Sequence, residues 1–174
     1  AQVLRRAGWN AITFNYRGSW GSPGSFRFAQ NPQDAAAVLA FVRDPANAAR
    51  LGIDPARIAM VGHSMGGWVT TLVASADEGL IGAGLISAAN MGVMPGLDRD
   101  GIIKLAAENA EALADVTPET MADELIAGGP GFDFLNAAPG LARYPLLVLS
   151  SDDGLAPQTD ALIAVVRSNS GSQI

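Results

Sequence analysis

The sequence has 174 residues, of which 49% are hydrophobic and 16% charged, proportions that fit one globular domain with a core and exclude a disordered chain. The net charge of -6 argues against a nucleic acid or an anionic membrane surface as the main partner. The absence of cysteine excludes disulfides, thiolate metal sites and a cysteine nucleophile.

Apolar, β-branched runs alternate with helical patterns along the chain, which is typical of a parallel α/β sheet. Ala1–Ala7 has the pattern of the end of a helix, Asn10–Tyr16 that of a strand, and a long loop rich in glycine, serine and aromatic residues follows. The remaining predicted elements of the sheet layer are a helix that begins with Asn31 as its N-cap and ends at Asp44-Pro45, a strand over Arg57–His63, a helix from about Met65 to Ala76, a strand over Gly82–Ala89, a strand over Tyr144–Ser151 and a helix over Pro157–Arg167. This order predicts one α/β domain over residues 1–174, with a mostly parallel sheet and flanking helices.

The segment from Asn90 to Leu141 is too long for an ordinary connection between two strands. Apolar residues at helical spacing indicate one helix around Leu105 and a second one that begins at Thr117, its predicted N-cap. We therefore expect a helical cap inserted at about residues 90–141.

The motif GHSMGG, at Gly62–Gly67, lies between a predicted buried strand and a predicted helix. A serine on such a tight turn adopts a positive φ, and bulky side chains two positions away would collide, which accounts for Gly62 and Gly66. This context predicts Ser64 as a nucleophile and the backbone N–H of Met65 as an oxyanion-hole donor. The alternative is a glycine-rich turn in which the serine occurs by chance.

The chain resembles the α/β-hydrolases, and among them the prolyl-oligopeptidase-type peptidases and related esterases. The resemblance covers nearly the whole chain and rests on FNYRGSWGSPGSF, on GHSMGG, and on YPLLVLSSDDGLAP. It implies an incomplete α/β-hydrolase fold and a Ser–acid–His triad in that chain order. The implied activity is hydrolysis of ester or amide bonds through an acyl-enzyme, with no cofactor and no metal.

Asp152 and Asp153 both follow a predicted strand, at the edge of the sheet where catalytic groups collect. The family often places a proline four residues after the acid, and Asp153 with Pro157 fits this pattern, so the resemblance favours Asp153 over Asp152. One or both aspartates could instead cap the following helix. A calcium site is a weaker alternative, because SDDG and DRDG lack the ligand spacing of a calcium loop.

The single histidine, His63, directly precedes Ser64. Adjacent side chains at a strand end point to opposite sides, so we expect His63 to be structural. The resemblance places the catalytic histidine beyond Ile174 and a further strand between Asn10–Tyr16 and Arg57–His63. We therefore expect a fragment that lacks both ends, has a gap in its sheet, is poorly stable and is inactive alone.

The expected substrate is a small ester or a peptide, with esters preferred. A non-catalytic binding module with the same fold stays open as the alternative, because a serine without a base is a weak nucleophile. No membrane span is predicted, and a cytoplasmic location is preferred to a secreted one. Arg17 is expected to brace the loop, whereas Trp20, Phe26 and Phe28 could either line a pocket near Ser64 or pack beneath the loop.

Overall fold

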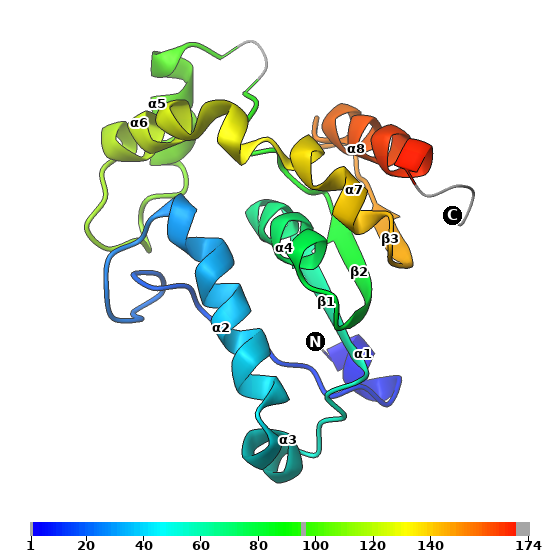
Figure 1. Cartoon of the computed structure of the whole chain (residues 1–174). Coiled ribbons are helices and arrows are strands. Elements are labelled where there is room, and N and C mark those ends of the chain that lie inside the picture. Colours follow the sequence, from blue (N-terminus) through cyan, green and yellow to red (C-terminus); the bar gives the residue numbers. More distant parts are fainter. Residues whose placement is uncertain (1, 95–96, 170–174) are drawn as a thin grey trace.

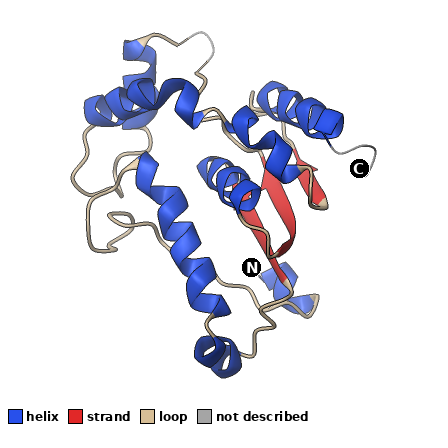
Figure 2. Cartoon of the chain, viewed as in Figure 1, coloured by secondary structure: helices blue, strands red, loops and turns tan. Residues whose placement is uncertain are grey.

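A computed structural model of the chain describes residues 2–94 and 97–169 (Figure 1). The elements in chain order are α1 (Gln2–Arg6), the 3-10 helix η1 (Phe28–Gln30), α2 (Asn31–Arg43), α3 (Pro45–Leu51), β1 (Ile58–His63), α4 (Met65–Ala76), β2 (Leu80–Ile86), α5 (Arg99–Ala107), α6 (Pro118–Gly128), the 3-10 helices η2 (Gly129–Phe132) and η3 (Phe134–Ala137), α7 (Ala138–Leu141), β3 (Leu146–Leu149) and α8 (Ala156–Asn169). Figure 2 shows the strands with helices lying around them.

The sheet contains β1, β2 and β3 side by side in that order, and both pairs are parallel. The last paired residues at the carboxyl ends of the strands are His63 of β1, Ile86 of β2 and Leu149 of β3, with Ile86 lying opposite the other two. Helix α4 connects β1 to β2 and packs against both of them. The predicted α/β class with a parallel sheet is confirmed, and the carboxyl ends of the three strands lie at one edge of the sheet (Figure 1).

The hydrophobic core lies on the face of the sheet that α4 covers. Trp68 and Val69 of α4 are fully buried against Leu85 of β2. Further fully buried side chains come from the segments that surround α4, namely Phe26, Phe134, Leu141, Leu162 and Val166. This burial, and not intrinsic helix propensity, is the main stabilisation of the packed elements.

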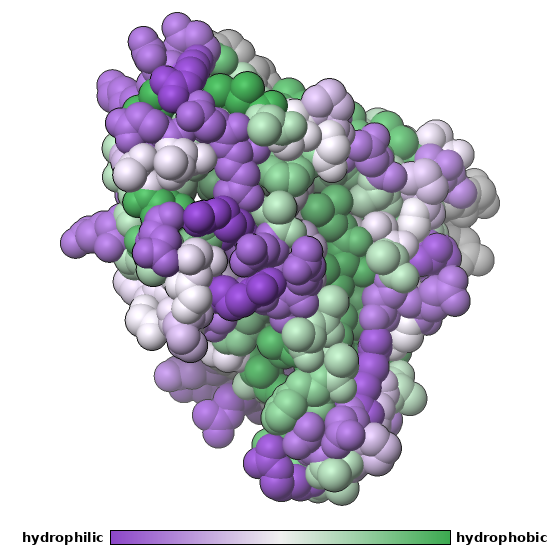
Figure 3. All heavy atoms as spheres, turned by 60° about the vertical axis from the view of Figure 1, so that its left-hand side comes forward, coloured by the Kyte–Doolittle hydropathy of each residue, from purple (hydrophilic) through white to green (hydrophobic). Residues whose placement is uncertain are grey.

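The opposite face of the sheet is exposed in the part of the chain that the structure describes. Along β1 and β3, partly buried residues alternate with exposed ones. Val61 is 49% and Leu147 57% exposed, and Leu149 and Ile81 are exposed as well. A view of another side, in Figure 3, also shows apolar residues gathered in a band between polar flanks. In residues 2–94 and 97–169, no helix is long and apolar enough to cross a membrane.

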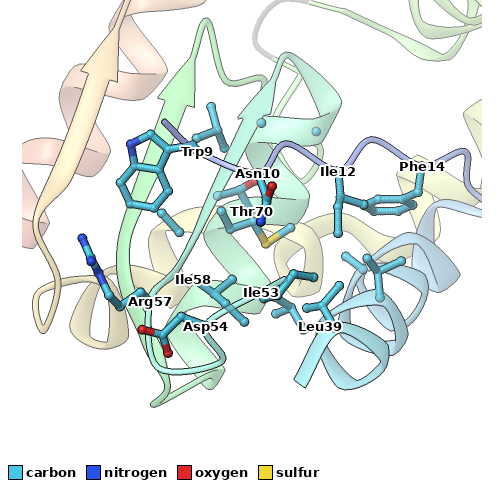
Figure 4. Close-up of a pocket in the computed structure, with 18 of the residues that line it drawn as sticks. Trp9, Asn10, Ile12, Phe14, Leu39, Ile53, Asp54, Arg57, Ile58 and Thr70 are labelled. Atoms are coloured by element: carbon cyan, nitrogen blue, oxygen red, sulfur yellow. The ribbon is translucent and has the colours of Figure 1, made fainter. Parts of the chain in front are cut away.

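The predicted strand at residues 10–16 is wrong, because these residues belong to no strand. A groove of about 460 Å³ lies between this segment and β1 (Figure 4). Trp9, Ile12 and Phe14 lie along one side of the groove, and Leu39 and Ile58 along the other. An extended segment forms a strand only where a neighbour takes up its backbone hydrogen bonds, and no described strand lies beside this one. The gap in the sheet that the resemblance implies stays a prediction.

The start of α2 differs from the prediction. Asn31 is the first residue of the helix, and its N-cap is Gln30. The Asn31 amide is buried and donates to the sulfur of Met65 at 3.4 Å, so a tertiary contact replaces the predicted cap. The predicted end at Asp44 is confirmed, but Asp44 also accepts from the backbone N–H of Asn47 and thereby caps α3, a helix that the sequence pattern did not reveal.

Helices α5 and α6 pack against each other between β2 and β3 in sequence, beyond the carboxyl ends of the strands (Figure 1). Thr117 caps α6, as predicted, in a reciprocal capping box with Thr120. Two backbone hydrogen bonds connect the glycine-rich loop to this region. Trp20 N–H donates to the Ala112 oxygen at 2.9 Å, and Ala114 N–H donates to the Gly18 oxygen at 2.7 Å. The insertion of a cap at about residues 90–141 stays a prediction.

Candidate active site

Ser64 lies on the turn between β1 and α4 with φ 53° and ψ -121°. Backbone hydrogen bonds fix this strained conformation: Ser64 N–H donates to the oxygen of Ile86 at 3.0 Å, and the Ser64 oxygen accepts from Gly67 at 2.9 Å and from Ala89 at 3.1 Å. The Ser64 side chain forms no capping hydrogen bond with α4. The hydroxyl is therefore held on a sharp turn without being used to stabilise the helix.

The glycines of the motif have different roles. A Cβ atom on Gly62 would lie 1.9 Å from the carbonyl oxygen of Gly66, and one on Gly67 would lie 2.5 Å from Cβ of Ala88. These two positions therefore require glycine. A Cβ atom on Gly66 would meet nothing closer than the Tyr16 hydroxyl at 4.0 Å, so the predicted collision at this position is not found. The reason is that Gly66 borders the open groove.

Met65 is the first residue of α4. Its backbone N–H belongs to the first turn, whose amides have no acceptor within the helix, and the helix dipole adds positive potential there. The Met65 sulfur accepts from the amide of Asn31, which holds the side chain in place. An oxyanion formed beside Ser64 would find a donor at this position.

Asp153 follows β3, and both of its carboxylate oxygens accept hydrogen bonds. Oδ2 accepts from Ser151 Oγ at 2.6 Å, and Oδ1 accepts from the backbone N–H of Leu155 at 3.0 Å. The Ser151 hydroxyl, then the Ser87 hydroxyl and the Leu155 N–H, lower the pKa of Asp153 to about 2. The Asp153 carboxylate is thus charged throughout the neutral range.

Asp152 differs from its neighbour in its surroundings. Among the described residues, no hydrogen bond involves the Asp152 carboxylate. The helix-capping alternative applies in part to Asp153, because Leu155 immediately precedes α8. The oriented carboxylate at this edge of the sheet is that of Asp153.

The strand order brings these groups to one edge. Ser64 follows β1 and Asp153 follows β3, with β2 between them. Both residues therefore follow the carboxyl ends of strands that have one strand between them. His63 lies on the exposed side of β1, and in the described part of the chain no hydrogen bond joins it to Ser64.

The other residues singled out from the sequence are mainly structural. Arg17 pairs with Asp34 of α2 and so braces the loop. Phe26 and Phe28 are buried in the core with their rings edge to face at 5.1 Å. Trp20 is 76% exposed, so it neither lines a pocket near Ser64 nor packs beneath the loop. Within residues 2–94 and 97–169, no three acidic or histidine side chains gather to hold a metal ion.

Tyr16 lies close to the motif and was not identified as a site residue from the sequence. Burial, and then the charge of Asp34, raise the pKa of Tyr16 to about 12, so its hydroxyl stays neutral. Ser87 and Ser151 were missed as well. Their only signal is that each follows a strand, and which strands are neighbours cannot be read from these residues.

Comparison with known proteins places this geometry in a wider group. The profile of the alpha/beta hydrolase family matches residues 2–169. The chain is also similar to a solved structure from a study titled "Hydrolytic potential of the ammonia-oxidizing Thaumarchaeon Nitrososphaera gargenis - crystal structure and activity profiles of carboxylesterases linked to their metabolic function". The TM-score is 0.58 at 16% identity, over 95% of this chain and 71% of that one, a likeness of fold. No curated protein sequence matches the chain.

Proposed function

This chain belongs to the alpha/beta hydrolase family, and from that premise we propose that it is a serine hydrolase of carboxylic ester or amide bonds. Ser64 is the nucleophile, the backbone N–H of Met65 supplies one donor of the oxyanion hole, and Asp153 is the acid that orients a histidine. The observation that carries the proposal is the positive φ of Ser64, held by bonds to β2 and to the segment after it. A turn with no chemical role has no need of that strain.

The reaction runs through a covalent intermediate. Ser64 Oγ attacks the carbonyl carbon while an imidazole accepts the hydroxyl proton, and the Met65 N–H stabilises the resulting oxyanion. The C–O or C–N bond then breaks, the leaving group takes the proton from the imidazolium, and an acyl-Ser64 ester remains. Water, deprotonated by the same imidazole, hydrolyses this ester and regenerates Ser64.

The imidazole that the proposal requires is not that of His63. The one histidine of this sequence, His63, lies on the exposed side of β1, directly before the turn. The proposed triad order places the base after Asp153, as in the family that the chain resembles. Without that base, we expect residues 1–174 to react slowly.

Esters are the preferred substrate class. The similar solved structure comes from a study whose title names carboxylesterases, and this supports an ester over a peptide. The peptide alternative rests on the loop motif FNYRGSWGSPGSF alone. Parallel assays with a p-nitrophenyl ester and the corresponding peptide anilide separate the two when each rate is divided by its uncatalysed rate, and we expect the larger acceleration for the ester.

A fluorophosphonate probe tests the proposal, because the serine oxygen displaces fluoride at phosphorus and stays covalently labelled. We expect peptide mapping to place the label on Ser64, with no label on Ser64→Ala or on heat-denatured protein. Ser75→Ala is the matched control: Ser75 lies in α4 and donates to the Leu72 oxygen at 2.8 Å, so its loss should leave labelling intact. Because His63 is not the proposed base, the labelling is done with imidazole added to the solution. A folded protein that is not labelled at Ser64 even then would favour the non-catalytic binding module.

A further inference from the structure

A pair of serine hydroxyls connects the end of β2 to the acid that follows β3. Ser87 Oγ lies 2.9 Å from Ser151 Oγ, and Ser151 Oγ donates to Oδ2 of Asp153 at 2.6 Å. A hydroxyl has one proton to donate, and that of Ser151 is used on the carboxylate. The bond between the two serines is therefore donated by Ser87 and accepted by Ser151, so the three groups form a directed chain that ends on the carboxylate.

We propose that Ser87 and Ser151 are positioning residues that hold the Asp153 carboxylate in one orientation, an inference that rests on the serine hydrolase function proposed above. The Leu155 N–H holds Oδ1 and the Ser151 hydroxyl holds Oδ2, which fixes the plane of the carboxylate. Each carboxylate oxygen keeps a second lone pair, so an imidazole N–H can still be accepted.

The backbone of Ser87 supports this role. Ser87 has φ 42°, is only 5% exposed, and its N–H donates to the Leu149 oxygen of β3 at 2.8 Å. A positive φ in a non-glycine residue is strained, and such strain persists where surrounding contacts impose it. The turn at Ser87 ends β2 before the predicted Ala89 and directs the hydroxyl toward Ser151.

The same turn also contacts the nucleophile. The carbonyl oxygen of Ile86 accepts the hydrogen bond from the N–H of Ser64 at 3.0 Å, and the next residue, Ser87, begins the hydroxyl chain to Asp153. The last residue of β2, Ile86, and the residue that follows it, Ser87, thus link the serine on one side to the acid on the other. Their spacing sets the distance that the imidazole has to bridge.

The test is a titration of the Asp153 carboxyl carbon by NMR in the full 174-residue chain. We expect Ser151→Ala to raise the pKa of Asp153 from about 2 toward 3.8, the value for an aspartate without these donors. Ser151 is exposed, so this variant leaves no cavity. Ser151→Thr keeps the hydroxyl and should restore the low value. Ser168→Ala removes a hydroxyl of α8 that bonds only to near neighbours, the Val165 oxygen and the Asn169 side-chain amide, and should leave the pKa of Asp153 unchanged.

Two variants test Ser87. Ser87→Ala removes the hydroxyl, and Ser87→Gly removes it while relieving the backbone strain, so that at least one should fold. Both should raise the pKa of Asp153, by less than Ser151→Ala does. An unchanged titration in folded Ser151→Ala and in the folded Ser87 variant would overturn the proposal.

A second readout separates positioning from a local electrostatic effect. With imidazole added to the solution, the labelling rate of Ser64 should rise in the wild type, and this stimulation should fall in Ser151→Ala and return in Ser151→Thr. Equal stimulation in all three would contradict the positioning role. Failure of Ser64 to label at all would reject the hydrolase function instead, while the titration would still report on the hydroxyl chain.

Discussion

Gly62 and Gly66 approach each other so closely that a Cβ atom on Gly62 would lie 1.9 Å from the carbonyl oxygen of Gly66. The contact joins the end of β1 to the first turn of α4, on the two sides of Ser64. The approach restricts Gly62 alone, because the Cβ position of Gly66 faces open space.

We therefore predict unequal effects of alanine at the two glycines. Gly62→Ala should lower the free energy of unfolding by about 3 kcal/mol or more, since the backbone has to move to relieve the overlap. Gly66→Ala should be neutral or stabilising by up to about 1 kcal/mol, because alanine is the better helix former. Urea denaturation of both variants measures this, and equal losses would contradict the one-sided contact.

The strained backbone at Ser64 predicts that the protein is more stable with glycine at this position than with alanine. Ser64→Gly should be more stable than Ser64→Ala by about 1 kcal/mol, because glycine adopts φ 53° and ψ -121° without steric strain. Urea titrations of the two variants provide the comparison. If Ser64→Ala is the more stable, the turn does not hold Ser64 under strain.

The pair of Arg43 and Asp77 predicts a pH dependence of stability. Hydrogen bonds from Arg43, one of them 2.8 Å long, lower the pKa of Asp77 below 3.8. Because the folded state holds the lower pKa, this stabilisation is complete above the unfolded value and is lost as the pH falls from about 4 through the folded pKa. Asp77→Asn should lower the free energy of unfolding by about 1 kcal/mol at pH 7 and should make that free energy less dependent on pH below about pH 4.

Asp123→Asn provides the control for that titration, because the pair of Arg99 and Asp123 is exposed on both sides. Loss of this exposed pair should change the pH dependence of the free energy of unfolding less than Asp77→Asn does. Denaturation curves from pH 2.5 to 7 measure both, and an identical response of the two variants would contradict the special role of Asp77.

Trp68 ties α4 to the segment that follows α6. Its Nε1 donates to the Phe132 carbonyl oxygen at 2.7 Å, and its ring lies edge to face with that of Phe132 at 5.2 Å. Trp68→Phe should lower the free energy of unfolding by about 2 kcal/mol, because the fully buried Trp68 site loses this hydrogen bond and part of its packing. Trp20→Phe, at an exposed site, should have almost no effect, and similar losses in both would argue against this contact.

The bare face of the sheet predicts self-association. Val61 on β1 and Leu147 on β3, the two outer strands of the three-stranded sheet, expose apolar side chains on the face that α4 does not cover. Leu147→Lys should shift the sedimentation profile toward the monomer at high concentration. Val3→Lys, on the short helix α1, changes an apolar residue that is more exposed than Leu147 but lies outside the sheet, and should leave the profile unchanged.

The agreement between prediction and structure depends on how local each signal is. Thr117 and Thr120 satisfy each other within one turn, so the start of α6 could be predicted from four residues. Asn31 shows the same kind of signal, but its amide bonds to Met65, thirty-four residues away, which no local pattern contains. Residues 10–16 have a strand pattern but lack a neighbour, and strand formation requires one.

The candidate site divides in the same way. Ser64 and Met65 could be predicted because strand, turn and helix follow one another in sequence. Asp153 could be placed at the correct edge of the sheet, but its hydrogen bonds depend on β2 and β3 being neighbours in register. Ser87 and Ser151 therefore become visible only in three dimensions.

Intact-mass analysis after incubation with p-nitrophenyl acetate tests most directly whether Ser64 forms an acyl-enzyme. We expect one acetyl group per chain, mapped to Ser64, formed faster when imidazole is added and absent from Ser64→Ala. A folded protein that gains no acetyl group, or that carries it elsewhere in both the wild type and Ser64→Ala, would contradict the account.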